Sequence, residues 1–218
     1  MVRLITSTFV VGHMWEVGGD IVIYSTKESI VAVVGERSIK NYNGPLYNVT
    51  EIHAKNYNKV TYRDDIALIK LDTSYYGEPL VPEDVELQAE PFVISEEINE
   101  CYIFGYGSEE FTGAATLELR IGSLDIITQE QCEEDLGKYM APERGSGMFC
   151  AIGKSSSGLV DACQGDSGGS FLCKSKSNSK KYHVVGITSY GAGCGAPNKP
   201  GVYTDVQSHY EWIKEVMK

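Results

Sequence analysis

The segment DACQGDSGGS, residues 161–170, carries the strongest chemical signal in the chain. It places the hydroxyl of Ser167 on a tight, glycine-rich turn, where backbone N–H groups can converge on a developing oxyanion. A second segment, RDDIALIKL at residues 63–71, contains Asp65, a carboxylate that can accept a hydrogen bond from an imidazole and hold its tautomer. The two residues predict nucleophilic catalysis, which also requires a histidine base near the serine.

Short runs rich in Val, Ile, Tyr and Thr, broken by Gly, Asn and Pro, must position these residues, and they predict an all-β protein. The expected strands lie at residues 20–26, 29–35, 65–71, 100–107, 117–127, 182–191 and 201–206. Residues 77–92 contain three prolines and several acids and predict a linker. Two β units of similar size, joined by a polar crossing segment, are therefore expected.

Two stretches have the pattern of helices. Residues 128–140 begin with Thr128 as the expected N-cap and carry acids in their first turns. The C-terminal residues 208–218 begin with Ser208, which is expected to cap the second helix. The side chains expected on one face of that helix are Tyr210, Ile213 and Met217.

Composition and charge limit the classes of partner. The chain has 218 residues, of which 42% are hydrophobic and 22% charged, as in an ordinary globular protein. Its formal net charge of -11 is spread over both halves, which argues against nucleic acid and anionic membranes and favours basic partners. No apolar run approaches the roughly 20 residues that span a bilayer, so no membrane association is expected.

The cysteine content predicts the redox compartment. All six cysteines lie in the second half of the chain, at Cys101, Cys132, Cys150, Cys163, Cys173 and Cys194. An even number without CxxC spacing or clustered histidines favours three disulfides over a metal site. Disulfides predict an oxidising compartment, and hence a secreted, extracellular protein. The single sequon, Asn48-Val49-Thr50, fits an exposed and glycosylated loop.

The Ser167 and Asp65 segments resemble those of the chymotrypsin/trypsin family of serine endopeptidases, and the resemblance runs from about Arg3 to the C-terminal helix. It implies an all-β fold of two six-stranded antiparallel Greek-key barrels followed by a C-terminal α-helix. Residues 1–90 would form the first barrel, incomplete at its N-terminus, and residues 91–218 the second barrel with the helix. Together they would make one peptidase domain.

The resemblance also implies roles for individual residues. Ser167 matches the nucleophile, Asp65 the triad acid, and the N–H groups of Gly165 and Ser167 the oxyanion hole. Asp166 matches the residue that, in active members, pairs with a freshly cut Ile or Val amino terminus. The implied disulfides are Cys101–Cys173, Cys132–Cys150 and Cys163–Cys194.

The resemblance extends to a pocket for a cationic side chain. Ser189, Gly191 and Gly201 lie at the family's pocket positions, and Asp161 lies where a trypsin-type floor carries its carboxylate. Glycine walls admit a long side chain, and a carboxylate at the base attracts the Arg or Lys at its end. The implied preference is for basic residues before the scissile bond.

The histidine base is where the chain departs from the family. Residues 3–11, RLITSTFVV, resemble the strand that in active members runs into Ala-Ala-His-Cys, but here the chain continues as GHMWE. Counting without gaps puts Trp15 at the base position and Glu16 at the cysteine position, whereas an alternative register puts Tyr24 at the base position. His13 lies two residues early, a displacement of roughly 6 to 7 Å along a strand. Since a base must come within about 3 Å of the nucleophile, His13 could serve only in a rebuilt loop.

Of the other histidines, His53 resembles a different family histidine, on a strand shortly before the acid, while His183 and His209 lie in the second half of the chain, on an expected strand and before the terminal helix. The sequence therefore favours a secreted serine-protease homologue that is inactive or severely impaired and acts by binding. Expected partners are proteins or peptides with Lys or Arg, with proteases, protease inhibitors and host-defence cascade proteins as candidates. The alternative is an active endopeptidase cleaving after Arg or Lys, with His13 in a rearranged loop or with an amino-terminal segment missing from the sequence.

No cofactor and no metal are expected. Residues 36–46 correspond to the loop that binds calcium in some relatives, but Glu36 supplies the single carboxylate there, whereas calcium takes several oxygen ligands. One histidine and one carboxylate, at His13 and Glu16, are too few for another metal site. The protein is expected to be a monomer.

Overall fold

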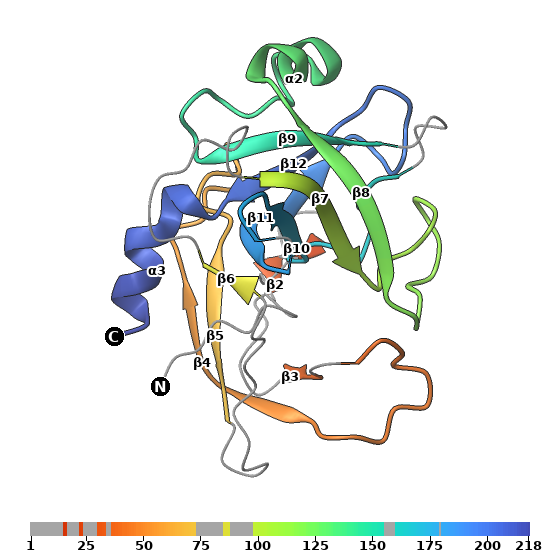
Figure 1. The fold of residues 1–218 in the computed structure, drawn as a ribbon, viewed down its shortest axis with the longest axis vertical. Coiled ribbons are helices and arrows are strands. Elements are labelled where there is room, and N and C mark those ends of the chain that lie inside the picture. Colours follow the sequence, from red (N-terminus) through yellow and green to blue (C-terminus); the bar gives the residue numbers. More distant parts are fainter. Residues whose placement is uncertain are drawn as a thin grey trace.

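The fold is mostly β, as the sequence predicts (Figure 1). The computed structural model describes residues 15–16, 22–23, 30–33, 36–72, 85–87, 98–154, 160–178 and 180–218. Its two α-helices in these residues are short, and one of them lies at the C-terminal end. No helix in the described part of the chain is long and apolar enough to cross a membrane.

The second half of the chain forms a closed antiparallel barrel. Its six strands are β7 (Ile98–Gly105), β8 (Arg120–Ile127), β9 (Met148–Gly153), β10 (Ser170–Ser175), β11 (Tyr182–Gly191) and β12 (Gly201–Asp205). The strands neighbour one another in the order β10-β7-β8-β9-β12-β11, and a further pairing of β10 with β11 closes the ring. Closure pairs every edge within the ring, so the barrel is a rigid base for the loops that leave it.

The first half contributes smaller sheets. β1 (Trp15–Glu16) pairs with β2 (Val22–Ile23), and a second sheet has the order β3-β4-β5. The strands of this second sheet are β3 (Val31–Ala32), β4 (Tyr47–Ala54) and β5 (Ala67–Leu71). β6 (Val85–Glu86) falls inside the expected linker and pairs in parallel with β11, so this segment is partly docked on the second barrel.

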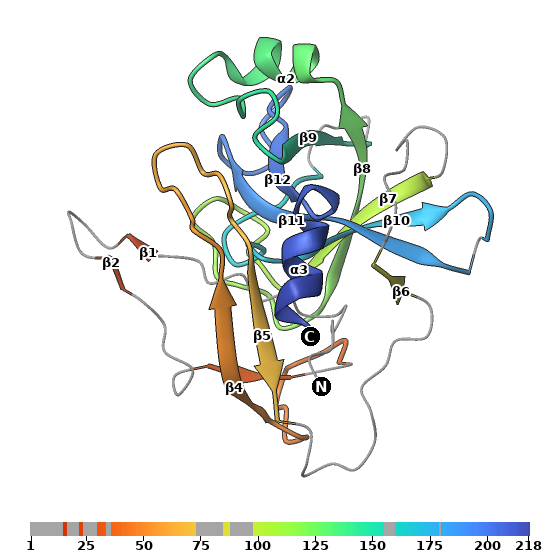
Figure 2. The same cartoon turned by 90° about the vertical axis from the view of Figure 1, so that its left-hand side faces the viewer.

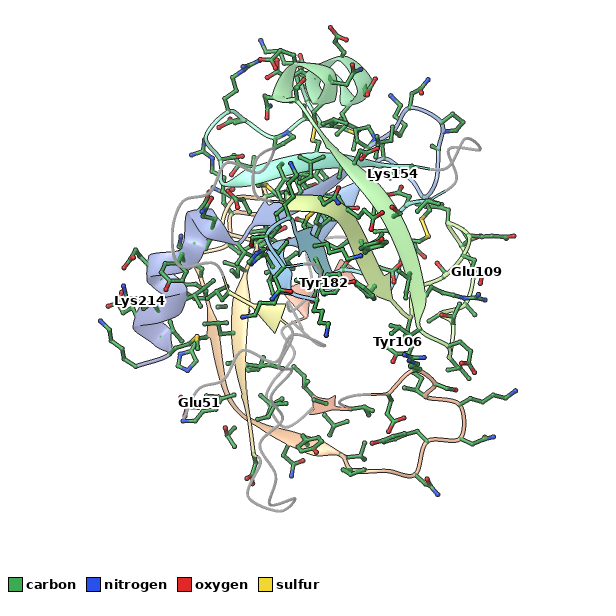
Figure 3. All side chains as sticks on the ribbon, in the orientation of Figure 1. Glu51, Tyr106, Glu109, Lys154, Tyr182 and Lys214 are labelled. Atoms are coloured by element: carbon green, nitrogen blue, oxygen red, sulfur yellow. A yellow bond between two sulfur atoms is a disulfide. The ribbon has the colours of Figure 1, made fainter. Side chains whose placement is uncertain are left out.

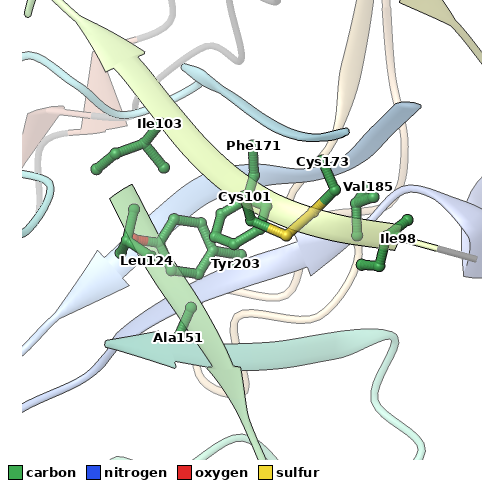
Figure 4. Packing of buried hydrophobic residues seen from close by; sticks show 9 residues of the cluster. All are labelled: Ile98, Cys101, Ile103, Leu124, Ala151, Phe171, Cys173, Val185 and Tyr203. Atoms are coloured by element: carbon green, nitrogen blue, oxygen red, sulfur yellow. A yellow bond between two sulfur atoms is a disulfide. The ribbon is translucent and has the colours of Figure 1, made fainter. Parts of the chain in front are cut away.

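Aromatic rings fill the interior of the closed barrel. Phe171 and Tyr203 are fully buried, and their ring centroids lie 4.8 Å apart. Figure 4 shows the two rings between Leu124 and the Cys101–Cys173 disulfide. Edge-to-face ring pairs of this kind add to the large apolar area that each ring buries.

A second core joins the two halves of the chain. Ile66, just before β5, and Leu68, within it, pack with three residues of the second half: Leu172 of β10, Ile187 of β11 and Ile213 of the terminal helix. Figure 1 and Figure 2 show that helix, α3, on the outside of the molecule, beside β5 and in front of the barrel strands when seen from that side. This shared apolar contact holds the loop before β5 against the second barrel.

The helices lie where the sequence places them, but one cap differs. α2 (Gln129–Leu136) has the expected N-cap, because the Thr128 hydroxyl accepts from the Gln131 N–H at 3.2 Å. α3 (Tyr210–Val216) follows a 3₁₀ turn, η2 (Gln207–His209), so the prediction that Ser208 caps the terminal helix is wrong. The Ser208 hydroxyl instead donates to Asp205 Oδ2 at 2.6 Å, and Asp205 Oδ1 accepts from the Gln207 N–H.

The disulfide pairing is confirmed. The three bonds are Cys101–Cys173, Cys132–Cys150 and Cys163–Cys194, and no cysteine is free. Cys101–Cys173 ties β7 to β10 inside the barrel, while Cys163–Cys194 joins two loops. Figure 3 shows labelled charged side chains, among them Glu109, Lys154 and Lys214, on the outside of the molecule.

Candidate active site

A pocket of about 210 Å³ opens on the second barrel. Five of the residues expected at the site line it: Asp161, Ser167, Ser189, Gly191 and Gly201. Gly165, the remaining residue of the expected oxyanion turn, lies between Gln164 and Ser167, which both line the pocket. The structure therefore brings the serine hydroxyl and the carboxylate together in one cavity.

Asp161 is held by the backbone. One carboxylate oxygen accepts from the N–H of Ala162 at 2.8 Å, and the other accepts from the N–H of Gly195 at 3.0 Å. Burial raises the pKa of Asp161 to about 6, the two backbone hydrogen bonds oppose this rise, and the charge of Asp166 adds to it. The carboxylate is thus oriented and partly desolvated, which suits it to pair with a cation that enters the pocket.

This raised pKa predicts a pH dependence of ligand affinity. The affinity of an amidinium ligand should be constant well above pH 6 and should fall about tenfold for each pH unit below the pKa of about 6, because the protonated carboxyl carries no charge. In the ligand-free protein, Asp161 should make the free energy of unfolding fall as pH rises from about 4 to about 6, because its carboxyl keeps the proton to a higher pH in the folded state than in the unfolded state. Fluorescence titration with p-aminobenzamidine between pH 5 and 8 measures the first effect. An affinity independent of pH would contradict it.

The wall at Gly201 must be glycine. A Cβ added there would lie 2.8 Å from the Tyr203 hydroxyl oxygen and 3.2 Å from Asp161 Oδ1, so a side chain would displace the groups at the floor. A Cβ at Gly191 would make ordinary contacts, the nearest at 3.7 Å. Tyr203 lines the pocket, and its hydroxyl, next to Gly201, is buried without a hydrogen-bond partner among the described residues. It can therefore bond a group that reaches the floor.

The turn that carries Ser167 is fixed from below by Asp166. Its Oδ1 accepts from the N–H of Gly107 at 2.8 Å and its Oδ2 accepts from the N–H of Cys163 at 2.9 Å. Burial raises the pKa of this carboxyl, while the two backbone bonds oppose the rise. A Cβ at Gly107 would lie within 2.6 Å of the carboxylate atoms, which explains the glycine. Gly165 adopts φ 95°, a backbone conformation that side chains disfavour.

Asp65 is anchored to the second barrel. The Ser189 hydroxyl donates to Asp65 Oδ2 at 2.6 Å, and the Thr204 hydroxyl donates to the Asp65 carbonyl oxygen at 2.9 Å. Since Ser189 also lines the pocket, one side chain connects the acid to the serine cavity. Asp65 comes from the loop between β4 and β5, so the candidate acid and the candidate nucleophile come from different halves of the chain.

Comparison with known proteins decides the family. The sequence model of the family named Trypsin matches residues 9–213. The chain belongs to the trypsin family. It is 34% identical over 160 residues to coagulation factor XI of Bos taurus, 33% over 163 residues to serine protease 56 of Mus musculus, and 38% over 172 residues to serine protease snk of Drosophila melanogaster.

The aligned regions cover 73%, 72% and 76% of this chain. They cover 24%, 25% and 37% of the bovine, mouse and fly proteins, so the chain spans only a quarter to somewhat over a third of these trypsin-family relatives. The similarity covers only this part of each relative, so it does not assign the activity, substrates or partners of the whole relatives to this chain.

Two histidines of this trypsin-family chain are engaged elsewhere than at the pocket. His53 on β4 lies 3.0 Å from Glu51 Oε2 through its Nε2 atom. The buried ring of His209 lies with Nδ1 2.8 Å from the Asp205 carbonyl oxygen and Nε2 3.2 Å from Asp64 Oδ1. His183 lies in β11, where it is the strand partner of Cys173.

The candidates for the base position lie largely outside the described residues. His13 and Tyr24 are not among them, and Trp15 and Glu16 are described as the strand β1, paired with β2. Arguments about the catalytic base therefore rest on the sequence alone, whereas the structure describes the candidate acid, Asp65, and the candidate nucleophile, Ser167. No group of three or more His, Cys, Asp or Glu side chains in the described residues could hold a metal ion.

The pocket also contains residues that the sequence analysis missed. Among them are Phe111, Gln164, Thr188, Tyr190 and Tyr203. Tyr190 and Tyr203 fall inside predicted strands, so their place next to Ser189 and Gly201 could have been inferred. Phe111, which is 57% exposed, lies in a loop closed by a bridge between Ser108 and Ala115. No sequence pattern predicts that this loop reaches the pocket.

Proposed function

We propose that this chain is a secreted trypsin-like serine-protease homologue that binds Arg and Lys side chains and is catalytically inactive or severely impaired. The observation that carries the proposal is the carboxylate of Asp161 in the pocket that also contains Ser167. The two backbone hydrogen bonds of Asp161 leave its orientation fixed, and the glycine at 201 leaves space above it. A guanidinium or ammonium group at the end of a long side chain fits these features.

The charge of the chain supports basic protein or peptide partners. The formal net charge of -11 favours the approach of basic segments, and the pocket would then hold a single Arg or Lys from such a segment. Active proteases, protease inhibitors and proteins of a host-defence cascade are the candidate partners. Export of the protein fits its three disulfides, which persist in oxidising compartments.

Impaired catalysis follows from the base position. In the ungapped register Trp15 stands where a family member carries histidine. Loss of the histidine in a comparable triad costs roughly 10⁶-fold in turnover. An oxyanion hole and binding alone leave about 10³- to 10⁴-fold acceleration over water, too little for a digestive or cascade protease.

A second candidate function is an active endopeptidase that cleaves after Arg or Lys. The observation that favours it is the acid, since Asp65 accepts from Ser189 at 2.6 Å and from Thr204 through its carbonyl oxygen, as a positioned triad acid would require. In that case His13 would be the base, carried by a rearranged loop. The rest of the site is common to both functions.

Amidolysis and ligand binding, measured together, distinguish these functions. We expect p-aminobenzamidine to bind and the hydrolysis of benzoyl-arginine p-nitroanilide to remain within about 10⁴-fold of the uncatalysed rate. The His13→Ala variant should retain this residual rate, because His13 takes no part in it. Faster hydrolysis that disappears in both Ser167→Ala and His13→Ala would establish the active enzyme instead. Absence of ligand binding in a folded, disulfide-bonded protein would refute both.

A further inference from the structure

The sequon Asn48-Val49-Thr50 lies at the start of β4, in a strand rather than in the loop that the sequence suggested. Side chains alternate along this strand, so Val49 is 6% exposed whereas Asn48 and Thr50 are exposed to solvent. The Thr50 hydroxyl donates to the Lys70 carbonyl oxygen at 3.0 Å, and the Asn48 carbonyl oxygen accepts from the Asp72 N–H at 2.9 Å. The sequon is thus held extended, with its acceptor side chain on the outer face of the sheet.

Exposed apolar side chains surround Asn48. Val31 is the direct strand partner of Asn48, and side chains of directly opposed residues lie on the same face. Ile52 lies four residues after Asn48 on β4, and the alternating burial of the strand, in which residues 48, 50 and 52 are exposed, places it on that face as well. Leu46 lies directly before the strand, two residues from Asn48. Val31 is 54% exposed, Leu46 51% and Ile52 37%. We call these three residues the β4 apolar face.

Exposed apolar patches on a protein surface mark sites that another group can contact and cover. The sequon lies in the middle of the β4 apolar face, so the covering group can come from the chain's own modification. A sugar linked to Asn48 would leave the sheet between Val31 and the residues along β4 and would contact them through its apolar ring faces.

We propose that Asn48 is N-glycosylated and that the first sugars of the glycan cover the β4 apolar face. This inference rests on the secretion that is part of the proposed function. In the transfer, the side-chain amide nitrogen of Asn48 forms a bond to the anomeric carbon of an oligosaccharide carried on a polyprenyl pyrophosphate. The bond from that carbon to the pyrophosphate oxygen breaks, the amide loses one proton, and the lipid pyrophosphate leaves.

The glycan does not belong to the pocket. Every residue that lines the pocket lies at position 111 or later, so none comes from β3 or β4. Ligand binding at Asp161 should therefore be the same with and without the sugar. This separates the glycosylation proposal from the ligand binding of the proposed function, because either of these can fail while the other stands.

The attachment is tested by expressing the full chain in eukaryotic cells behind a supplied signal sequence, so that entry into the secretory pathway is given. Peptide N-glycosidase F should sharpen the lumenal and secreted protein into one faster-migrating band and convert Asn48 to Asp in the mass spectrum of its peptide. Asn48→Gln and Thr50→Ala should abolish the shift, and the matched Thr50→Ser variant should retain it. Unmodified Asn48 in lumenal, disulfide-bonded protein would overturn the proposal.

The covering role has its own measurement. Enzymatic removal of the glycan from the folded protein should increase the fluorescence of an apolar dye, and the increase should be lost in a Val31→Thr, Ile52→Thr double variant. The affinity for p-aminobenzamidine should not change on removal of the glycan. A dye signal that is the same before and after deglycosylation would show that the sugar does not cover this face.

Discussion

Replacing Asp161 by asparagine is expected to weaken the binding of p-aminobenzamidine by about 30- to 5,000-fold, which corresponds to the roughly 2–5 kcal/mol lost when one member of a buried, hydrogen-bonded charge pair is removed. The amidinium would enter the same pocket but would meet a neutral amide, and the hydration that it gives up on entry would not be replaced. Fluorescence titration of the wild type and the variant measures the difference.

Folding of the Asp161→Asn variant should be little changed. Asparagine has nearly the same shape and can keep one of the backbone N–H bonds, and its neutral amide avoids the desolvation that raises the pKa of Asp161. Asp125→Asn is the matched control, since Asp125 lies exposed on β8, 3.1 Å from Lys154, and should bind the ligand like the wild type. If Asp161→Asn binds the amidine as tightly as this control, the pocket is not a cation site.

The sequence predicts strands well where Val and Ile are dense, but it misses β4, although the side chains of that strand alternate between buried and exposed, and it misses the two barrel strands β9 and β10. β9 reads MFCAIG and β10 reads SFLCKS, and in β10 five of the six residues are buried, so there is no polar face to produce an alternation. Short apolar runs of this kind cannot be assigned from periodicity alone. Ser170 also follows directly on the serine turn, which hides the start of β10 as a strand.

In the candidate site, too, some features can be predicted from local sequence and others cannot. Asp161, Ser167, Ser189, Gly191 and Gly201 come from three short segments, and local sequence is enough to find them. The contacts that orient Asp65 come from Ser189 and Thr204, which are 124 and 139 residues away along the chain. These contacts depend on how the barrel closes and on how the loop before β5 packs against it, and neither can be predicted from a local sequence pattern.

That docked loop is held by a second polar contact, centred on His209. The His209 side chain is 3% exposed, and both of its ring nitrogens face acceptors, the Asp205 carbonyl oxygen and Asp64 Oδ1. Because a carbonyl oxygen only accepts, Nδ1 must donate to it, and Nε2 faces the Asp64 carboxylate. Lys55 Nζ lies 2.8 Å from the same carboxylate oxygen. Burial raises the pKa of Asp64, but Lys55 and His209 together outweigh it and lower the pKa below its usual value.

Replacing His209 by phenylalanine is therefore expected to lower the free energy of unfolding by about 2–3 kcal/mol, since it fills the space but leaves two acceptors without their donor. Asp64 is partly open to water and keeps Lys55, which limits the loss. Asp64 also adopts φ 57°, so the release of its side chain should relax the turn that leads to Asp65 and weaken amidine binding through the Ser189 contact.

Chemical denaturation compares His209→Phe with His53→Gln, the matched control, whose partly exposed ring should change stability by less than about 0.5 kcal/mol. His209→Ala should lose more than His209→Phe, because it adds a cavity to the same unpaired acceptors. Equal stability of the phenylalanine variant and the wild type would mean that packing alone holds the turn. A loss of stability with unchanged amidine affinity would mean that Asp64 and Asp65 are anchored independently, so that the bonds from Ser189 and Thr204 suffice to position the acid.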